Sequence, residues 1–422
     1  MKRLNWKKIL VVMLLGILCL SYAGAAGSRE TEQPGADEAV NVVFWHNYDA
    51  GAGQIQVLED LIQQFEAQNP GITVEQQYFE WGALKNNVVM GASSGDLPDI
   101  LRGDIGFIPQ FQSLNVLVAM DEELADYAEV AQTVMEAPNS TAYMKGHNYG
   151  LAANTNTKIL YYNKDMVPVA PRTLEEFWAA ALKATDKDTI GICEAWMGGW
   201  NVCQYIWSEG GSVLAPDYSR AEGYINSNIS VGVIEKMAQL HGANAFSGPT
   251  IDPGAPGDTD GMGSGAYAMT VDGPWKANDL ASKYPEMNFG TALFPRGAAG
   301  SIGVLGGEDF MLFKTSDKTH RDAAWEFIKF MAGSEAQIAM AKVGQMPVNK
   351  QALASPDAVK AMPLLPLFSE ALKTCRTRPV IPQWGEVSGI INTKTTEAVL
   401  GLKTARAAMD EAAAEIDALL AN

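Results

Sequence analysis

The stretch that decides the fold is NVVFWHNYDAGAGQIQVLEDLIQQFEAQNPGITVEQQYF, residues 41–79. Its first residues, 41–45, form a short apolar run that is typical of a buried strand. Residues 55–65 carry Ile, Leu and Phe at helical spacing, and the Asn-Pro-Gly sequence at 69–71 is a helix stop. Residues 72–79 alternate as a second strand. Strand, helix and strand at this spacing predict a parallel, doubly wound α/β sheet.

The alternation of strands and helices continues along the chain. LPDILRGD leads into a third strand, RTLEEFWAAALKAT is a helix with Thr173 as N-cap and Glu176 in a capping box, and TIGICEA is another strand. Residues 248–265, GPTIDPGAPGDTDGMGSG, are the longest Gly/Pro/Asp stretch and are expected to be a loop. HRDAAWEFIKFMAGSEAQIAMAKV is expected to be one helix, and the tail from Thr395 to Leu420 is also expected to be helical.

The composition describes an acidic globular protein. At 422 residues the chain exceeds the usual ceiling for a single core, so two domains are expected. A formal net charge of −18 argues against binding to nucleic acid and to an anionic membrane surface, because both need a basic face. A neutral or cationic small ligand would not be repelled.

The N-terminus has the pattern of a signal peptide. MKRLNWKK is a basic segment, ILVVMLLGILCL is an apolar run too short to span a bilayer, and SYAGAA supplies small residues. Residues 1–26 are therefore expected to be removed, with cleavage near Ala25 or Ala26. The protein is expected to be exported, to the periplasm or the cell surface. Lipid anchoring at Cys19 is the alternative to plain cleavage downstream of it.

The cysteine and histidine patterns indicate no metal site. Cys193 and Cys203 lie close in sequence, so an oxidising compartment allows a bridge between them, and buried free thiols are the alternative. No paired Cys or His spacing is present, and no metal or cofactor is expected. GASSG at 91–95 matches G-x-S-x-G, but a helix precedes it and a strand follows, which is the reverse of a nucleophile elbow.

Aromatic residues recur where strands stop. In TVDGPW, residues 270–275, the Gly-Pro corner holds a tryptophan just past a strand end. Ligands of open α/β sheets bind at the carboxyl ends of strands. Aromatic faces pack on sugar rings, and carboxylates and amides accept hydrogen bonds from hydroxyls. The set therefore predicts a carbohydrate cleft, with core packing as the alternative for any single tryptophan. Its aromatic members are Trp45, Tyr48, Trp81, Trp196, Trp275 and Trp384.

Several segments, in this order, carry a resemblance to a known family. They are VVFWHNY, SSGDLPDILRGDIGFIPQF, GHNYGLAANTNTKILYYNKDMV, SGAYAMTVDGPW, GQMPVNKQAL and RPVIPQWGEV. From about Asn41 to the C-terminus, the chain resembles the extracellular solute-binding proteins of bacterial ABC sugar importers, the maltose-binding-protein family. PDILRGDIGFIPQF looks most like the branch that takes maltooligosaccharides or arabinogalactan-type oligomers.

The resemblance implies an α/β protein with the two-lobed periplasmic-binding-protein fold, a hinge and an interlobe ligand cleft. Lobe one would comprise 41–152 plus 267–314, and lobe two 153–266 plus 315–422. The protein would be the substrate-binding component of an ABC transporter. It would close on a sugar or oligosaccharide by hinge bending and deliver it to ABC permease transmembrane subunits. We expect a monomer that is not an enzyme and that needs no cofactor.

The resemblance also supplies candidate contacts. In LRGD, Gly103 stands where the family has an aromatic residue, and Trp81 would compensate. Asp272 is either the polar neighbour of Trp275 or part of the turn. The polar candidates are His46, Asn47, Asp49, Arg102, Asp104, Asn154, Glu194 and Asp272, and the stacking platforms are Trp81, Trp196, Trp275 and Trp384.

Two alternatives remain open. The same fold could bind a polyamine, a peptide or glycerol phosphate. A secreted glycoside hydrolase with the same aromatic cleft would need two carboxylates flanking the scissile bond.

Overall fold

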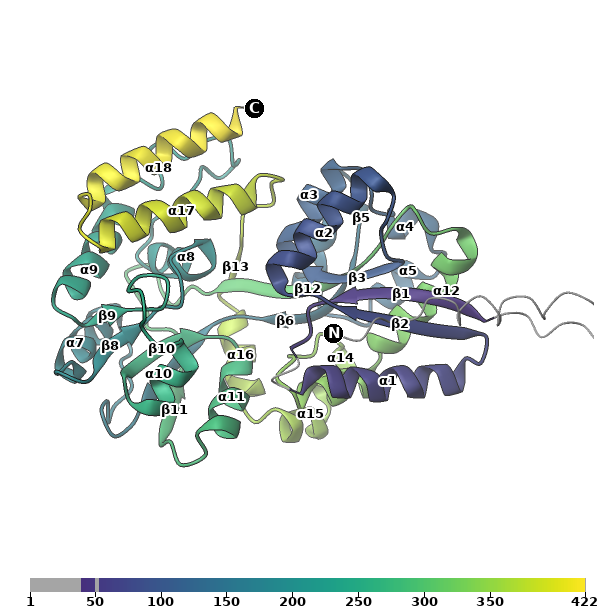
Figure 1. Ribbon diagram of the computed structural model, residues 1–422, viewed down its shortest axis with the longest axis horizontal. Helices are drawn as coiled ribbons and strands as arrows, with labels where there is room; N and C mark the ends of the chain where they lie inside the picture. Colours follow the sequence, from purple (N-terminus) through teal and green to yellow (C-terminus); the bar gives the residue numbers. More distant parts are fainter. Residues whose placement is uncertain (1–38, 50–52, 422) are drawn as a thin grey trace, which may run out of the picture. The chain divides into compact units, whose positions relative to one another are not determined.

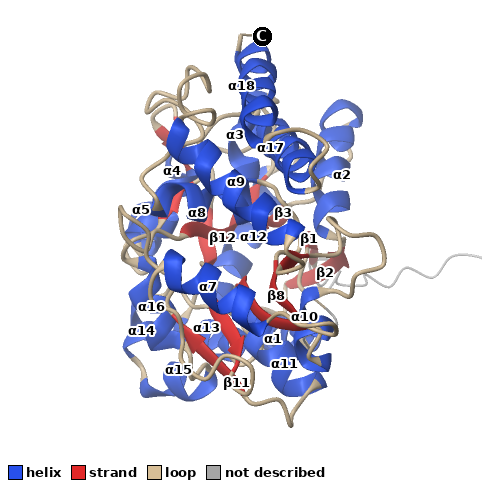
Figure 2. Ribbon diagram, turned by 90° about the vertical axis from the view of Figure 1, so that its left-hand side faces the viewer, coloured by secondary structure: helices blue, strands red, loops and turns tan. Residues whose placement is uncertain are grey.

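Two mixed β-sheets, each covered by helices on both faces, organise the computed structural model, which describes residues 39–49 and 53–421. The predictions of a signal peptide and of lipidation at Cys19 lie outside these residues. Within the described ranges no helix has the length and apolar character that a membrane span requires. Figure 2 shows the strands enclosed by helices.

The first sheet contains the predicted strand–helix–strand unit. Strand β1 (Val40–His46) pairs in parallel with β2 (Ile72–Tyr78) and with β3 (Ile100–Asp104). Helix α1 (Gln54–Gln68) connects β1 to β2 (Figure 1). It buries the leucine, isoleucine and phenylalanine side chains that its spacing predicted, except Ile55, which is only partly buried. The parallel half of the sheet is therefore as predicted.

The other half of the first sheet is antiparallel. Strand β12 (Val304–Leu312) runs antiparallel to β3 and to β6 (Leu151–Asn156), and the short β13 (Arg376–Thr377) pairs with its start. The second sheet has the order β11-β7-β10-β8-β9 and is also mixed, because β7 runs antiparallel to both neighbours. The prediction of a parallel sheet therefore holds for only part of each sheet, because periodicity reveals a strand but not its direction. The strands of the second sheet are β7 (Ile159–Asn163), β8 (Ile190–Cys193), β9 (Phe246–Ser247), β10 (Tyr267–Asp272) and β11 (Phe289–Ala292).

Helices cover both faces of each sheet. Around the first sheet and its loops lie α2 (Trp81–Ser94), α3 (Ile108–Ser113), α4 (Met120–Glu123), α5 (Tyr127–Ala131), α6 (Glu136–Asn139), α12 (Lys318–Met331), α13 (Ser334–Ala341) and α14 (Lys350–Ala354), with the hairpin β4 (Tyr143–Met144) and β5 (His147–Asn148). Around the second lie α7 (Leu174–Ala184), α8 (Gly199–Ser208), α9 (Asn228–Gly242), α10 (Asp258–Ser264), α11 (Trp275–Lys283), α15 (Pro356–Ala361), α16 (Leu365–Leu372), α17 (Trp384–Val399) and α18 (Ala405–Leu420).

Sheet membership differs from the predicted division of the chain. Strands β10 and β11 belong to the second sheet, although 267–314 was assigned to lobe one. Helix α12 packs into the core of the first sheet, although 315–422 was assigned to lobe two. The chain passes from the first sheet to the second after β6 and returns in the segment between β11 and β12. It leaves for the helices of the second sheet again after α14. The resemblance suggested a return near Tyr267, some twenty-five residues too early by the bounds of β11.

Two local predictions also need correction. Part of the expected loop forms the helix α10. Its first turn carries Asp258 and Asp260, and negative side chains at this end stabilise a helix because they offset the positive end of its dipole. The single helix expected from 320 to 343 is broken before Gly333 into α12 and α13. The tail is helical as predicted, in α17 and α18, which are separated at Gly401, whose φ is 70°.

The capping prediction for α7 was correct in its main feature. The Oγ1 of Thr173 accepts a hydrogen bond from the backbone N of Glu176. The Glu176 carboxylate, however, accepts from the backbone N of Arg172 rather than from that of the N-cap residue.

Candidate functional site

A cavity of about 590 Å³, here called the ligand cavity, is lined by aromatic side chains from elements of both sheets. Its volume is in the usual range for small-molecule sites. The aromatic lining consists of Trp81, Phe107, Trp196, Trp200, Trp275 and Trp384. All four tryptophans that were predicted as stacking platforms therefore meet in one cavity.

The tryptophans reach the cavity from helix starts that follow strands. Trp81, Trp275 and Trp384 are the first residues of α2, α11 and α17. Trp196 lies between β8 and α8, and Trp200 is the second residue of α8. The exposed fraction of these side chains ranges from 50% for Trp81 to 5% for Trp384. The cavity is therefore lined both by accessible rings and by rings that belong to the core.

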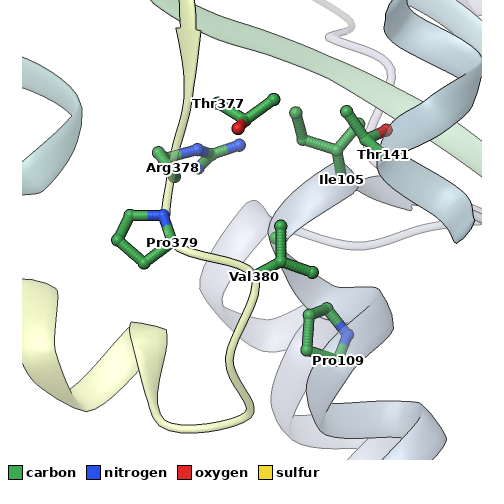
Figure 3. Close-up of a pocket in the computed structure, with 8 residues that line it drawn as sticks. Ile105, Pro109, Thr141, Thr377, Arg378, Pro379 and Val380 are labelled. Atoms are coloured by element: carbon green, nitrogen blue, oxygen red, sulfur yellow. The ribbon is translucent and has the colours of Figure 1, made fainter. Parts of the chain in front are cut away.

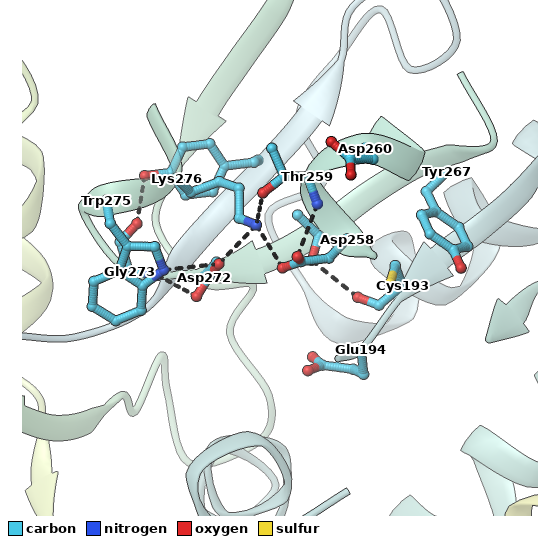
Figure 4. Close-up of polar contacts among 12 residues, drawn as sticks. Cys193, Glu194, Asp258, Thr259, Asp260, Tyr267, Asp272, Gly273, Trp275 and Lys276 are labelled. Carbon is cyan, nitrogen blue, oxygen red and sulfur yellow. Dashed lines mark hydrogen bonds and ion pairs between the residues drawn. The ribbon is translucent and has the colours of Figure 1, made fainter. Parts of the chain in front are cut away.

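The turn before α11 fixes the indole of Trp275. A Cβ on Gly273 would lie 2.2 Å from the indole ring, so only glycine leaves room for the ring at this place. The indole Nε1 donates to Oδ2 of Asp272 at 3.1 Å, and the other oxygen of that carboxylate accepts from the backbone N of Gly273 (Figure 4). Asp272 is therefore both part of the turn and the polar neighbour of Trp275.

A buried lysine anchors this arrangement. The Lys276 side chain is 2% exposed, and its Nζ lies 2.6 Å from Oδ2 of Asp258 and 3.1 Å from Oδ2 of Asp272. It also donates to Oγ1 of Thr259 at 2.6 Å (Figure 4). Burial raises the pKa of Asp272 above its usual value, and the positive charge of Lys276 opposes that shift. The ammonium group thus compensates two carboxylates that burial would otherwise destabilise.

Arg378 and Asp104 form a second fixed pair on the cavity wall. Arg378 donates to Oδ1 of Asp104 at 2.7 Å, and its guanidinium lies 5.6 Å from the centre of the Trp200 ring. The same oxygen of Asp104 accepts from the backbone N of Gly106. Asp104 was predicted as a contact, whereas Arg378 and Trp200 were missed. No sequence signal marks Arg378, because its partner lies 274 residues away.

Asn156 provides a polar group at the end of β6. Its Oδ1 is buried and has no hydrogen-bond partner among the described residues. A Cβ on the facing Gly306 would lie 2.1 Å from this oxygen, and Gly307, with φ of 139°, follows. The bare backbone of Gly306 leaves room for the amide of Asn156, and Asn156 lines the ligand cavity where the sequence reasoning had placed Asn154.

The rest of the cavity lining was also missed. Ser388 and Asn392 on α17 accept hydrogen bonds from the backbone N of Gly199 and of Met197, so they fix the loop that carries Trp196. Lys85, Glu308, Gly198, Gly385 and Gly389 complete the lining.

Arg102 lies behind the cavity wall instead of in it. Its side chain is 2% exposed and forms an ion pair of 2.9 Å with Glu308, which does line the cavity. Its guanidinium also lies 4.0 Å from the centre of the Tyr48 ring. It donates to Oδ1 of Asn47 at 2.6 Å, to Oδ1 of Asn154 at 3.1 Å and to Oε1 of Gln345 at 2.7 Å. The three predicted contacts Arg102, Asn47 and Asn154 thus support Glu308 and do not line the ligand cavity.

His46 and Asp49 lie away from the ligand cavity as well. His46 is buried, with Nε2 2.6 Å from Oε1 of Gln76 and Nδ1 accepting from the backbone N of Tyr48. Burial lowers the pKa of His46 to about 4, so the ring is neutral at pH 7. Asp49 is exposed, and its backbone N donates to Oε1 of Gln54. Tyr48 and Trp45 are core residues.

Glu194 is also behind the wall. It is 1% exposed, accepts from the Tyr205 hydroxyl at 2.5 Å, and lies 3.5 Å from Nζ of Lys158. Burial raises the pKa of Glu194 to about 7, and the positive charge of Lys158 opposes the shift. The predicted role of Glu194 as a direct sugar acceptor is therefore replaced by a role in holding Lys158.

The small pocket beside Arg378 is not a site for a sugar-sized ligand. The pocket in Figure 3, lined by Thr141, Arg378 and Val380 among others, has a volume of about 20 Å³, which suits a water molecule.

Within residues 39–49 and 53–421, no group of three or more His, Cys, Asp and Glu side chains could hold a metal ion. Cys193 and Cys203 are buried free thiols, so no bridge joins them.

Two mixed sheets and a tryptophan-lined cavity define a protein that binds a small molecule. The profile of the bacterial extracellular solute-binding protein family matches residues 60–366, and the chain belongs to that family. A putative binding protein of Brucella abortus is 25% identical over 423 residues, covering 97% of each chain. The maltotriose-binding protein of Pyrococcus abyssi is 25% identical over 368 residues, covering 83% of this chain and 76% of the relative.

The fold is shared with solved structures. The GacH receptor of Streptomyces glaucescens, solved unliganded and with acarbose, has a TM-score of 0.80 at 19% identity, and the match covers 91% of this chain and 99% of that one. This likeness confirms the predicted two-lobed α/β fold.

Proposed function

We propose that this protein is the substrate-binding component of an ABC sugar importer and that it captures a maltooligosaccharide-like sugar in the ligand cavity. The observation that carries the proposal is the convergence of five tryptophans on one cavity of about 590 Å³. Flat aromatic faces suit the apolar faces of sugar rings. The family match and the relative that binds maltotriose support the same class of ligand.

The charges of the ligand cavity suit a neutral ligand. Asp104 and Glu308 are the acidic side chains of the lining, and Lys85 and Arg378 are the basic ones. Asp104 is paired with Arg378, and Glu308 is paired with the buried Arg102. A phosphate would find two basic side chains, Lys85 and the already paired Arg378, beside two carboxylates, and a polyamine would find no excess of acid. The balance therefore favours a sugar over glycerol phosphate or a polyamine.

The same pairing argues against hydrolysis. A glycoside hydrolase needs a carboxylic acid that protonates the leaving group and a second carboxylate that acts as base or nucleophile. Both carboxylates of the ligand cavity are engaged in ion pairs with arginines, Glu308 with Arg102 and Asp104 with Arg378, so neither stands free as a catalytic acid or base. We therefore infer that the acids accept hydrogen bonds from sugar hydroxyls and that the protein is not an enzyme.

Capture would proceed by movement of the parts that carry the two sheets. The connections after β6, before β12 and after α14 are where the chain passes between the sheets and their helices, so they are the places where a hinge would act. We propose lobes that follow the sheets, with β10 and β11 in the second and α12 in the first. The loaded monomer, exported to the periplasm or anchored at the cell surface, would deliver its sugar to ABC permease transmembrane subunits.

A panel of ligands tests this function. Melting temperature and tryptophan fluorescence are recorded with maltose, maltotriose, galacto-oligosaccharides, spermidine and glycerol phosphate. A ligand that binds the folded protein raises its melting temperature once its concentration exceeds the dissociation constant. We expect shifts with the maltooligosaccharides. A shift with only spermidine or only glycerol phosphate would contradict the proposal that the ligand is a sugar. Release of shorter sugars on long incubation would show that the protein is an enzyme.

A further inference from the structure

A second cavity of about 220 Å³, here called the side chamber, adjoins the ligand cavity. The two cavities share the side chains of Trp196 and Trp275 as walls. The rest of the side chamber is built by the second sheet and its helices: Lys158, Ala195, Asn201, Asp258, Thr259, Val271, Asp272, Lys276 and Asp279. The two cavities therefore meet at the rings of Trp196 and Trp275.

The chemistry of the side chamber differs from that of the ligand cavity. Its two lysines already have partners, because Lys276 is bound by two carboxylates and Lys158 donates to Oδ1 of Asn201 at 2.7 Å and lies near Glu194. Asp279 has no hydrogen-bond or ion-pair partner in the part of the chain that the structure describes. The chamber thus offers carboxylate and amide acceptors, and no cation that is free of a carboxylate or amide partner.

We propose that the side chamber is a subsite for one end unit of the bound oligosaccharide, and that it accepts a neutral or amine-bearing unit and rejects an anionic one. The inference rests on the proposed sugar-binding function and adds to it the length and the charge of the ligand. Hydroxyl and ammonium groups donate to carboxylates, whereas a ligand carboxylate or phosphate would face acids without a free cation. The indoles of Trp196 and Trp275 add a favourable surface for a ring or for an ammonium group.

The length of the ligand is tested with a substitution that fills only the side chamber. Ala195 lines the side chamber and not the ligand cavity, so Ala195→Leu should occupy the space of the end unit. The matched control is Gly389→Leu, which fills the ligand cavity at a place where a Cβ would meet no atom within 4 Å. Calorimetric titrations with glucose, maltose, maltotriose and maltotetraose are compared for the two variants and the unmodified protein.

We expect the affinity of the unmodified protein to rise with sugar length. In Ala195→Leu the gain in affinity from the unit that would occupy the side chamber should disappear. The variant should bind the longer sugars about tenfold more weakly than the unmodified protein does, and the shortest sugar that binds with unchanged affinity. Gly389→Leu should weaken every length. Equal affinities in Ala195→Leu and the unmodified protein, or an equal loss at all lengths with a normal melting temperature, would overturn the subsite. If the unmodified protein binds none of the sugars, the proposed function itself fails.

The charge of the end unit is tested with maltotriose derivatives. At the reducing end, the neutral alditol, the 1-amino alditol and the aldonate differ only in the group at C1, which is neutral, positive or negative. The 6-hydroxyl, 6-amino and 6-carboxylate forms give the same series on the non-reducing ring. We expect the carboxylate at one of the two ends to bind roughly tenfold more weakly than its neutral counterpart, and Asp279→Asn to recover part of that loss. Carboxylates that bind as well as the neutral sugar at both ends would overturn the charge selection.

Discussion

The indole of Trp275 and the ammonium group of Lys276 meet on one carboxylate oxygen, Oδ2 of Asp272, each at 3.1 Å. Trp275 lines the ligand cavity, whereas Lys276 and Asp272 form a largely buried ion pair behind it. The position of the ring in the ligand cavity therefore depends on charged groups that do not line the ligand cavity itself.

Replacing Lys276 with methionine should destabilise the protein and weaken sugar binding. The substitution leaves the carboxylates of Asp258 and Asp272 without their shared cation, and removing one member of a buried ion group costs about 3–5 kcal/mol. Urea denaturation measures the loss. Lys283→Met on the same helix is the control, because that lysine is 56% exposed and should change stability by no more than about 0.5 kcal/mol. Equal stability of the two variants would contradict the role of Lys276.

Trp275→Ala and Trp384→Ala should separate binding from folding. Trp275 is only partly buried, so its loss should lower sugar affinity by roughly thirtyfold or more with a small change in stability. Trp384 is 5% exposed and lies in the core of the second sheet, so its loss should also cost about 3–5 kcal/mol of unfolding free energy. Titration calorimetry and urea denaturation are measured on both. Undiminished sugar binding by folded Trp275→Ala would show that its ring is not a platform.

Arg378→Met should weaken sugar binding about tenfold, because it frees the carboxylate of Asp104 and uncovers one face of Trp200. Arg378→Lys should recover only part of the affinity, since an ammonium group cannot reproduce the planar contact with the ring. Arg376→Met, two residues earlier and exposed, is the control and should bind as the unmodified protein does. If both methionine variants bind alike, Arg378 has no part in the site.

Glu194 should give the protein a measurable loss of stability with rising pH. Its pKa is about 7 in the folded protein against an ordinary value of 4.5, so the folded state holds the proton more tightly. The free energy of unfolding should therefore fall as pH rises from 4.5, with the loss complete above pH 7 and of order 3 kcal/mol. The difference in stability between the unmodified protein and Glu194→Gln, followed by urea denaturation from pH 4.5 to 8, isolates this effect. Parallel curves for the two proteins would contradict the raised pKa.

The aromatic half of the site was predictable from the sequence, whereas most of the polar half was not. Trp81, Trp196, Trp275 and Trp384 follow strand ends, and strand ends can be located from local patterns. Trp200 was missed, because an aromatic residue early in an apolar helix is equally typical of a core residue.

The polar contacts depend on pairings between distant parts of the chain. Arg102 and Glu194 have the right chemistry for a sugar, but Glu308 and Lys158 engage them from segments that no local pattern connects. Asn154 and Asn156 lie on the same face of β6, and only the packing of Gly306 decides that the second one reaches the cavity. The direction of β12 and the return of the chain before it escaped prediction for the same reason.

The central claim is that the tryptophan-lined cavity binds an oligosaccharide. Isothermal titration of maltotriose into the purified protein at pH 7 tests it most directly, with Trp275→Ala titrated beside it. We predict saturable binding of one sugar per protein molecule, with a rise in melting temperature and a loss of most of the affinity in Trp275→Ala. Absence of any saturable heat or melting shift with maltotriose, in a protein that unfolds cooperatively, would contradict the claim.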